Sequence, residues 1–209
     1  MPRSVHDRRW WILAVLCLTV VIVVIDNTIV NVALPVMSRD LHASNSSLQW
    51  IVDGYSLPFA GLLLAGGGLS DRFGRKRVMQ YALGSFGAFS LLAAFLTSVP
   101  TLLVARALMG ASAAFIFPAT LSTLTVAFDD LSERAKAFGF WGAASGVAIA
   151  IGPVAGGALL VHFWYGSIFI INAPLVLIAI VASAYVVPES RSPLAAAWTS
   201  RVSRSGPWA

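Results

Sequence analysis

Three charged residues lie within long apolar stretches of the sequence: Asp26, Asp53 and Arg106. A charged side chain at the centre of a membrane costs about 2.5–3.5 kcal/mol on insertion scales, so one that is kept there is usually paired, faces a cavity or has a function. A buried carboxylate can hold a proton or a cation, and competition between the two would link their movements. An arginine can pair with a carboxylate, either in a functional site or as a packing device. These residue types therefore point to ion pairing and proton exchange.

The composition explains which elements must position these charges. Of the 209 residues, 58% are hydrophobic and 11% are charged, and the mean hydropathy is +0.82, whereas soluble domains carry about 25% charged residues. We predict an all-α membrane protein, because the apolar stretches are long enough for helices to cross a bilayer and lack the alternation of barrel strands. Six spans are expected, at Trp11–Val36, Gln49–Leu69, Val78–Ser98, Thr101–Phe128, Ala137–Leu160 and Trp164–Val187.

The basic residues predict how the helices are oriented. Twelve of the 14 lysines and arginines fall before the first span, between the second and third, between the fourth and fifth, or after the sixth. Basic residues concentrate on the cytoplasmic side, so both termini are predicted to be cytoplasmic. The expected organisation is a cytoplasmic segment over residues 1–10, a six-helix bundle over 11–187 and a polar tail over 188–209. Because the basic residues are divided among short loops, the net charge of +5 is not interpreted as nucleic-acid binding.

The depth of each intramembrane charge follows from the helical rise of about 1.5 Å per residue. Asp26 lies roughly 15 Å from the outer end of its span, Asp53 roughly 6 Å and Arg106 roughly 8 Å. All three could therefore face one central space. Asp53 could instead reach the outer interface, and Arg106 could simply pair with one aspartate.

Small residues recur every four positions in the fourth and fifth spans. Such spacing permits close helix contact, and a proline inside a span bends it. The residues are Arg106, Gly110, Ala114 and Pro118 in the fourth span, and Ala148, Gly152 and Gly156 in the fifth, with Pro153 and Gly157 beside them. An ordinary structural crossing would account for the same spacing.

The loop between the second and third spans, "GGLSDRFGRKRVM" over Gly67–Met79, carries more than basic residues. Asp71 is expected just after the second helix, where a negative charge opposes the helix dipole, so we expect a dedicated partner for it. Gly74 supplies a turn in which φ can be positive. The charge rule alone requires neither residue.

This loop resembles the signature loop of the major facilitator superfamily, and four other segments resemble motifs of its drug:proton antiporters with fourteen spans. These are "IDNTIVNVALP" (Ile25–Pro35), "QWIVDGYSL" (Gln49–Leu57), "RALMGASAA" (Arg106–Ala114) and "IGPVAGG" (Ile151–Gly157). The matching site residues are Asn27, Thr28, Asn31 and Pro35 in the first span, Gly67, Asp71, Arg72, Gly74, Arg75 and Lys76 in the loop, and Gly152, Pro153, Gly156 and Gly157 in the fifth span. Met109 and Ala148 depart from the usual glutamine and glycine of the fourth-span and fifth-span motifs.

The resemblance implies proton-coupled export of cationic or lipophilic drugs across the cell membrane, with no cofactor or metal. Asp26 would be the coupling carboxylate, Asp53 would attract cations, Arg106 would belong to the motif linked to proton coupling, and the fifth helix would provide a bend. A metabolite carrier of the same superfamily and a non-transporting membrane remnant are the alternatives. An enzyme is disfavoured, because His6, His42 and His162 lie at or beyond the membrane edges.

The resemblance also implies a second bundle, because such transporters have two six-helix bundles and this sequence contains one. We expect partners in membrane lipid, protons, a small substrate, and either a C-terminal half or a second copy. The tail Arg191–Ala209 looks unrelated to the loop expected there, which suggests a truncated end. The bundle alone is expected to expose the face carrying Asp26 and Arg106 to lipid, and to be inactive.

Overall fold

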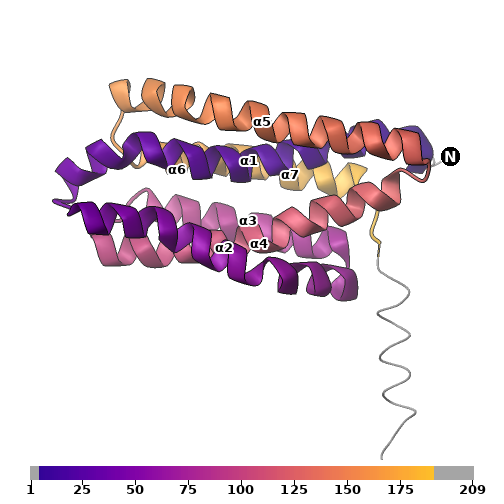
Figure 1. Ribbon diagram of the computed structural model, residues 1–209, viewed down its shortest axis with the longest axis horizontal. Helices are drawn as coiled ribbons and strands as arrows, with labels where there is room; N and C mark the ends of the chain where they lie inside the picture. The colour runs from indigo at the N-terminus through magenta and orange to yellow at the C-terminus, as the bar shows by residue number, and fades with distance from the viewer. Residues whose placement is uncertain (1–4, 191–209) are drawn as a thin grey trace, which may run out of the picture.

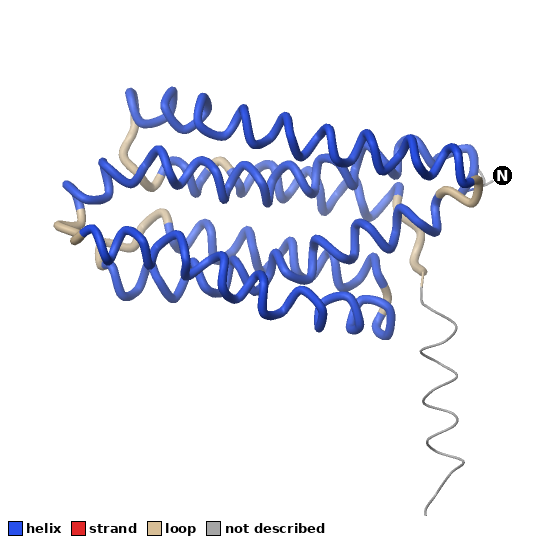
Figure 2. Tube along the Cα trace, viewed as in Figure 1, coloured by secondary structure: helices blue, strands red, loops and turns tan. Residues whose placement is uncertain are grey.

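The computed structural model describes residues 5–190, which form helices joined by short loops (Figure 2). No strand occurs among these residues, so the predicted all-α fold is confirmed. The helices are α1 (Val5–Asp40), α2 (Asn45–Phe73), α3 (Arg75–Ala93), α4 (Val99–Ala127), α5 (Leu131–His162), α6 (Ser167–Ile170) and α7 (Asn172–Val186). The last two together form the expected sixth span, which is interrupted at Ile171. The predicted tail from Arg191 onward lies outside the described residues.

Five stretches of the described chain are long and apolar enough to cross a membrane: Arg8–Asp40, α2, α4, α5 and Ser167–Val186. The helix α3 is shorter, with 19 residues, and begins with three consecutive basic residues. It nevertheless lies inside the bundle, packed against α4 and α7. The expected third span is therefore present as a packed helix whose first turn is polar.

The helices form two groups that lie against each other (Figure 1). One group contains α1, α5, α6 and α7, with α1 packed along α5, and the other contains α2, α3 and α4, with both α2 and α3 packed on α4. Contacts of α1 with α4 and of α3 with α7 join the groups. The two helices α1 and α4 carry most of the core, while α2 and α5 leave large apolar side chains exposed, such as Leu64 and Val161.

Local signals explain where the helices begin and why some boundaries differ from the predicted ones. The helix α2 begins four residues earlier than expected because Ser44 Oγ accepts a hydrogen bond from the Ser47 amide at 3.2 Å, which caps free amide groups. Asp130 caps α5 in the same way through the Glu133 amide, at 2.9 Å. At its other end α2 continues to Phe73, so the prediction that Asp71 follows the helix is wrong.

The α5–α6 turn is tied to the α3–α4 loop at the end of the bundle opposite the N-terminus. The Tyr165 hydroxyl donates to the Leu96 carbonyl, and Trp164 Nε1 donates to the Ala94 carbonyl at 3.4 Å. Burial raises the pKa of the Tyr165 hydroxyl, and the negative charge of Asp40 adds to this rise. These contacts hold together the two groups of helices at that end.

Candidate functional site

A buried ion pair joins the middle of α1 to α4. Arg106 Nη1 donates to Asp26 Oδ2 across 2.7 Å, and both side chains are completely buried. Attraction between two buried charges offsets their desolvation only when further hydrogen bonds complete both groups. The sequence left open which aspartate Arg106 would contact, and the structure places it on Asp26.

Arg106 is also held by α2. Its Nε donates to the Ile51 carbonyl at 3.2 Å, and its guanidinium carbon lies 4.3 Å from the centre of the Tyr55 ring, a cation–π geometry. The backbones approach closely here, because a Cβ atom on Gly110 would overlap the Tyr55 carbonyl. The predicted close contact of the fourth span is therefore confirmed at Gly110, and it fixes the arginine relative to α2.

The second oxygen of the carboxylate is bonded to a residue that our sequence analysis missed. Asn172, at the start of α7, donates through Nδ2 to Asp26 Oδ1 at 2.7 Å and to Ser90 Oγ at 2.9 Å. Ser90 Oγ donates in turn to the Phe169 carbonyl at 2.9 Å. Asn172 and Ser90 are completely buried. The available signal was an amide in an otherwise apolar span, which is less conspicuous in a sequence than a charge.

These contacts overturn one expectation about the isolated bundle. We expected it to expose Asp26 and Arg106 to lipid, but both are fully enclosed. The reason is that partners from α4 and α7 close over the carboxylate from two directions. The bundle satisfies its own buried charge.

Asp53 is not part of this cluster. It lies on α2 and is partly exposed, and within residues 5–190 no hydrogen bond or ion pair connects it to Asp26 or Arg106. The expectation that all three charges would meet in one place is therefore met only by Asp26 and Arg106. The role of Asp53 in attracting cations stays a prediction.

A cavity of about 460 Å³ lies beside the ion pair. Its walls come from α1, α2, α4 and α5, and Tyr55 belongs to both features, because its ring contacts Arg106 and lines the cavity. Aromatic rings continue from Tyr55 to Phe59, Phe117 and Trp141, with successive ring centres 6.3, 5.8 and 4.9 Å apart. The ion pair is thus joined to an aromatic surface that could accommodate a lipophilic molecule.

The residues of the first-span motif divide between this cavity and the surface. Asn27 and Thr28 line the cavity, and the Thr28 hydroxyl donates to the carbonyl of Val24 at 3.0 Å. Asn31 and Pro35 are exposed farther along α1. Only the first half of the motif therefore lies beside the ion pair.

The fifth-span motif packs against α1 one turn after Asp26. A Cβ atom on Gly152 would overlap Thr28 Oγ1, and one on Gly156 would lie 2.7 Å from Ile29 Cγ1. Pro153 lies inside the helix with its side chain exposed, and a Cβ on Gly157 would contact nothing within 4 Å. The structure therefore assigns close packing to Gly152 and Gly156.

The loop motif forms a compact turn between α2 and α3. Asp71, in the last turn of α2, accepts hydrogen bonds from Arg75 Nε at 2.8 Å and Nη2 at 2.7 Å. Gly74 lies between them with φ of +108°, which confirms the predicted positive φ. The partner expected for Asp71 is thus Arg75, four residues away. Arg72 instead lies over the Phe73 ring, 5.5 Å from its centre, and Gly67 faces Pro118 of α4.

This turn is fastened to the end of α7. Lys76 Nζ donates to the Ala184 carbonyl at 2.7 Å, and the Arg75 amide donates to the Ser190 carbonyl at 3.1 Å. The space above Gly74 is occupied by the Glu189 carboxylate, which a Cβ there would approach to 2.5 Å. The loop is therefore part of the fixed frame of the bundle.

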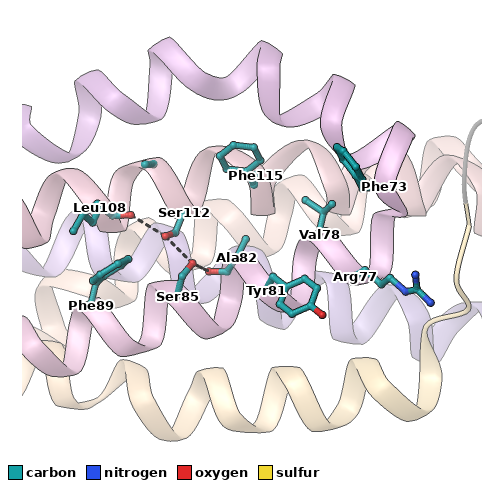
Figure 3. A pocket seen from close by; sticks show the side chains of 11 residues that line it. Phe73, Arg77, Val78, Tyr81, Ala82, Ser85, Phe89, Leu108, Ser112 and Phe115 are labelled. Carbon is teal, nitrogen blue, oxygen red and sulfur yellow. Dashed lines mark hydrogen bonds between the residues drawn. The ribbon is translucent and has the colours of Figure 1, made fainter. Parts of the chain in front are cut away.

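A larger pocket, of about 730 Å³, lies between α2, α3 and α4 (Figure 3). Its polar floor consists of Ser85 and Ser112, whose hydroxyl groups are 2.9 Å apart and also bond to carbonyls of their own helices. Neither Asp26 nor Arg106 lines it. Size alone does not make it the charge-bearing site. In the described part of the chain, no three His, Cys, Asp or Glu side chains are close enough to hold a metal ion.

The amino-acid sequence is similar to a known family and to several individual proteins. Residues 16–207 match the Major Facilitator Superfamily. The chain is 43% identical over 186 residues to the multidrug efflux pump LfrA of Mycolicibacterium smegmatis, covering 89% of this chain and 37% of the pump. It is 43% identical over 173 residues to the puromycin resistance protein pur8 of Streptomyces alboniger, covering 83% of this chain and 34% of that protein.

A third relative is the methyl viologen resistance protein SmvA of Salmonella typhimurium. It is 41% identical over 182 residues, covering 87% of this chain and 37% of SmvA. The chain therefore spans little more than a third of the length of these curated relatives.

Proposed function

Because the chain belongs to the major facilitator superfamily, we propose that it forms the N-terminal bundle of a proton-coupled drug exporter of the cell membrane. It is a multi-pass membrane protein of a transporter class and not of an enzyme class. The all-helical bundle and the sequence relationship to drug-efflux and drug-resistance proteins support the assignment. The observation that carries it is the buried Asp26–Arg106 pair next to a cavity with aromatic walls.

The substrate class proposed is a lipophilic or cationic organic molecule of drug size. The cavity combines the faces of Tyr55, Phe59 and Phe117 with aliphatic side chains. Aromatic faces attract cations by about 0.5–2 kcal/mol depending on desolvation, and apolar walls favour lipophilic groups. The partly exposed carboxylate of Asp53 would draw cations toward this half of the bundle.

Coupling to protons is assigned to Asp26. A carboxylate bonded to an arginine in a dry interior can exist as an ion pair or as a neutral acid, and each state holds Arg106 differently. Since Tyr55 contacts Arg106 and also lines the cavity, a change at the ion pair would be felt by a molecule in the cavity. Proton entry and drug exit would thereby be linked.

We propose that both termini lie in the cytoplasm. The α2–α3 and α4–α5 loops lie at the same end of the bundle as the N-terminus (Figure 1). The helices that follow these loops carry basic residues near their starts, among them Lys76 in α3 and Lys136 in α5. Arg9 Nη2, near the start of α1, contacts Glu133 Oε1 at the start of α5, at 2.8 Å. This arrangement supports a common basic end, as expected for the cytoplasmic side.

A complete transport path is proposed to need a second bundle. The exposed apolar faces of α2 and α5, together with the end of α2 that carries Asp71, provide surfaces for it. The close packing at Gly152 would let α1 and α5 move as one piece. Residues 1–209 alone are therefore expected to insert and fold without moving substrate. A second copy of the chain could substitute only if it supplied the missing walls.

The test compares the chain alone with the chain fused to the C-terminal part of the mycobacterial pump. Liposomes carrying either protein receive a proton gradient and a fluorescent lipophilic cation. The fusion is expected to move the cation and to lose this movement in Asp26→Asn, whereas Asp129→Asn, an exposed loop carboxylate, should leave it intact. Coupled movement that persists in Asp26→Asn would contradict the coupling role. Gradient-driven movement by the chain alone would contradict the need for a second bundle.

A further inference from the structure

We infer that Asn172 is the positioning residue that keeps Asp26 bonded to the bundle in both of its protonation states. The inference rests on the proposed proton exchange at Asp26. Its basis is the difference between the two side chains that contact the carboxylate: Arg106 on one oxygen and Asn172 on the other.

Arg106 favours the ionised state of Asp26. A guanidinium group has five N–H donors, no acceptor and a permanent charge. It therefore pairs with the carboxylate but cannot accept a hydrogen bond from the protonated acid. When a proton binds to a carboxylate oxygen, the charge attraction that holds Arg106 at 2.7 Å disappears.

Asn172 can bond to both states. Its amide nitrogen donates to Asp26 Oδ1 at 2.7 Å, while its own Oδ1 is buried and has no hydrogen-bond partner among the described residues. A protonated carboxyl group keeps an acceptor oxygen, so with the proton on Oδ2 the amide nitrogen can go on donating to Oδ1. With the proton on Oδ1, the amide can rotate about its Cβ–Cγ bond and accept through its own oxygen. A buried acceptor without a partner is uncommon, and here it leaves the amide oxygen of Asn172 available to accept.

Ser90 is the second hydrogen-bond partner of the Asn172 amide. Its hydroxyl now accepts from Asn172 Nδ2 at 2.9 Å and donates to the Phe169 carbonyl at 2.9 Å. A hydroxyl can donate as well as accept, so after the amide turns it can donate to the amide oxygen instead. The Ser90 hydroxyl can therefore follow the rotated amide oxygen, although it then gives up its bond to the Phe169 carbonyl and the amide N–H groups give up their present bonds.

The consequence is a change in which helices are bonded to α1. With Asp26 ionised, α1 is bonded to α4 and to α7, which joins the two groups of helices (Figure 1). With Asp26 protonated, the bond to α7 remains and the ion pair to α4 is lost. Arg106 then stays with α2 through the Ile51 carbonyl and the Tyr55 ring. The charged and titratable groups facing Asp26 in the described chain are Arg106 from α4 and the Tyr55 phenol from α2, while α7 and α3 present the neutral Asn172 and Ser90.

The test measures one carboxyl group and needs no transport. The purified chain in lipid nanodiscs is titrated by infrared difference spectroscopy, and the acid band of Asp26 is identified by its absence in Asp26→Asn. In Asn172→Leu this band should move to the position of an acid with weaker hydrogen bonding. The pH midpoint of the band should rise, because the ionised form of Asp26 loses a stronger hydrogen bond than the neutral form does. The protonation equilibrium should change about fivefold, which corresponds to about 0.7 of a pH unit.

The matched control is Gln80→Leu, which removes an amide that bonds α3 to α7 through Ser183 at 3.0 Å, away from Asp26. This control should leave the acid band of Asp26 and its pH midpoint unchanged. It thereby distinguishes a positioning effect of Asn172 on Asp26 from a general loosening of the α3–α7 interface. If Asn172→Leu does not insert, the smaller Asn172→Ser should give the same shift.

The two possible failures give different results. A band that titrates in the unmodified chain but is identical in the Asn172 variants would overturn this inference and leave the coupling role of Asp26 standing. The absence of any Asp26-dependent acid band between about pH 4 and pH 10 would remove the coupling role, and the inference with it.

Discussion

The substitution Arg106→Met tests whether the ion pair supports the fold. Methionine keeps much of the length of the side chain but removes the guanidinium group, and with it the bonds to Asp26 and to the Ile51 carbonyl. The carboxylate would then remain fully buried with Asn172 as its only described side-chain partner. This is the situation in which an interior charge has lost its counter-charge.

The expected loss follows from that burial. Removing one partner of a buried pair costs about 3–5 kcal/mol, and the value should fall toward the lower end because Asp26 can take up a proton. Folded domains are stable by only about 5–15 kcal/mol, so the change is large. Replacing both groups, in Asp26→Leu with Arg106→Met, should restore most of the loss, because apolar pairs of similar volume often replace buried ion pairs without penalty.

The assay is the free energy of unfolding, measured by denaturing-detergent titration in mixed micelles and followed by circular dichroism. Arg39→Met is the control, because Arg39 is exposed and, within residues 5–190, its side chain bonds only to the Pro35 carbonyl of its own helix. It should change stability by no more than about 0.5 kcal/mol.

The reasoning would be refuted by either of two results. A loss below about 1 kcal/mol in Arg106→Met, the range of exposed ion pairs, would mean that the pair contributes little to the fold. Strict additivity of the two single substitutions in the double variant would mean that the two side chains are not coupled.

Three further predictions concern packing, the loop and orientation. Gly110→Ala should lower stability by about 1–3 kcal/mol in the detergent-titration assay, because the added methyl overlaps the backbone of α2. Gly139→Ala, where a Cβ meets nothing within 4 Å, should be neutral or stabilising in the same assay. Gly74→Ala should destabilise by about 1–3 kcal/mol because φ is +108° and should speed proteolysis at the α2–α3 loop; unchanged cleavage would contradict this. In a cysteine-free background, Ser46→Cys and Ser132→Cys should be labelled by an impermeant thiol reagent from opposite sides of the membrane, and labelling of both from one side would reject the topology.

The charged part of the site could be predicted from the sequence. A charge within an apolar span is conspicuous because it is costly, so Asp26 and Arg106 were found without coordinates. Their pairing could not be predicted, because it depends on how far each helix is rotated about its axis. Asp53 has the same signal as Asp26, yet only Asp26 faces the arginine.

The neutral part of the site was missed for a physical reason. An amide in a span is much less costly than a charge, so Asn172 does not stand out in an apolar stretch, although the structure places it on the carboxylate. The burial of Asp26 and Arg106 within the bundle was also not predicted. From the sequence, a single bundle seemed to leave Asp26 facing lipid, because the contact of α7 with α1 is a tertiary feature that no local pattern records.

Helix boundaries were predicted less well where polar residues extend a helix beyond the membrane. The second span was expected to end at Leu69, but α2 continues to Phe73 because Asp71 and Arg75 bond across the turn. The positive φ of Gly74 was foreseeable, since a glycine within a charged loop is a common place for one.

The sequence separation of the site residues has a consequence for biosynthesis. Arg106 follows Asp26 by 80 residues, and Asn172 follows it by 146. At about 5–20 residues per second, the arginine is made about 4–16 s after the aspartate, and the asparagine about 7–29 s after it. The helix α1 therefore reaches the membrane before either partner exists, and its isoleucines and valines must offset a cost of about 2.5–3.5 kcal/mol for a central aspartate. The helix α7, which is made after α1 to α6, completes the hydrogen bonding of the carboxylate on α1, so the site is complete only when the whole bundle has been synthesised.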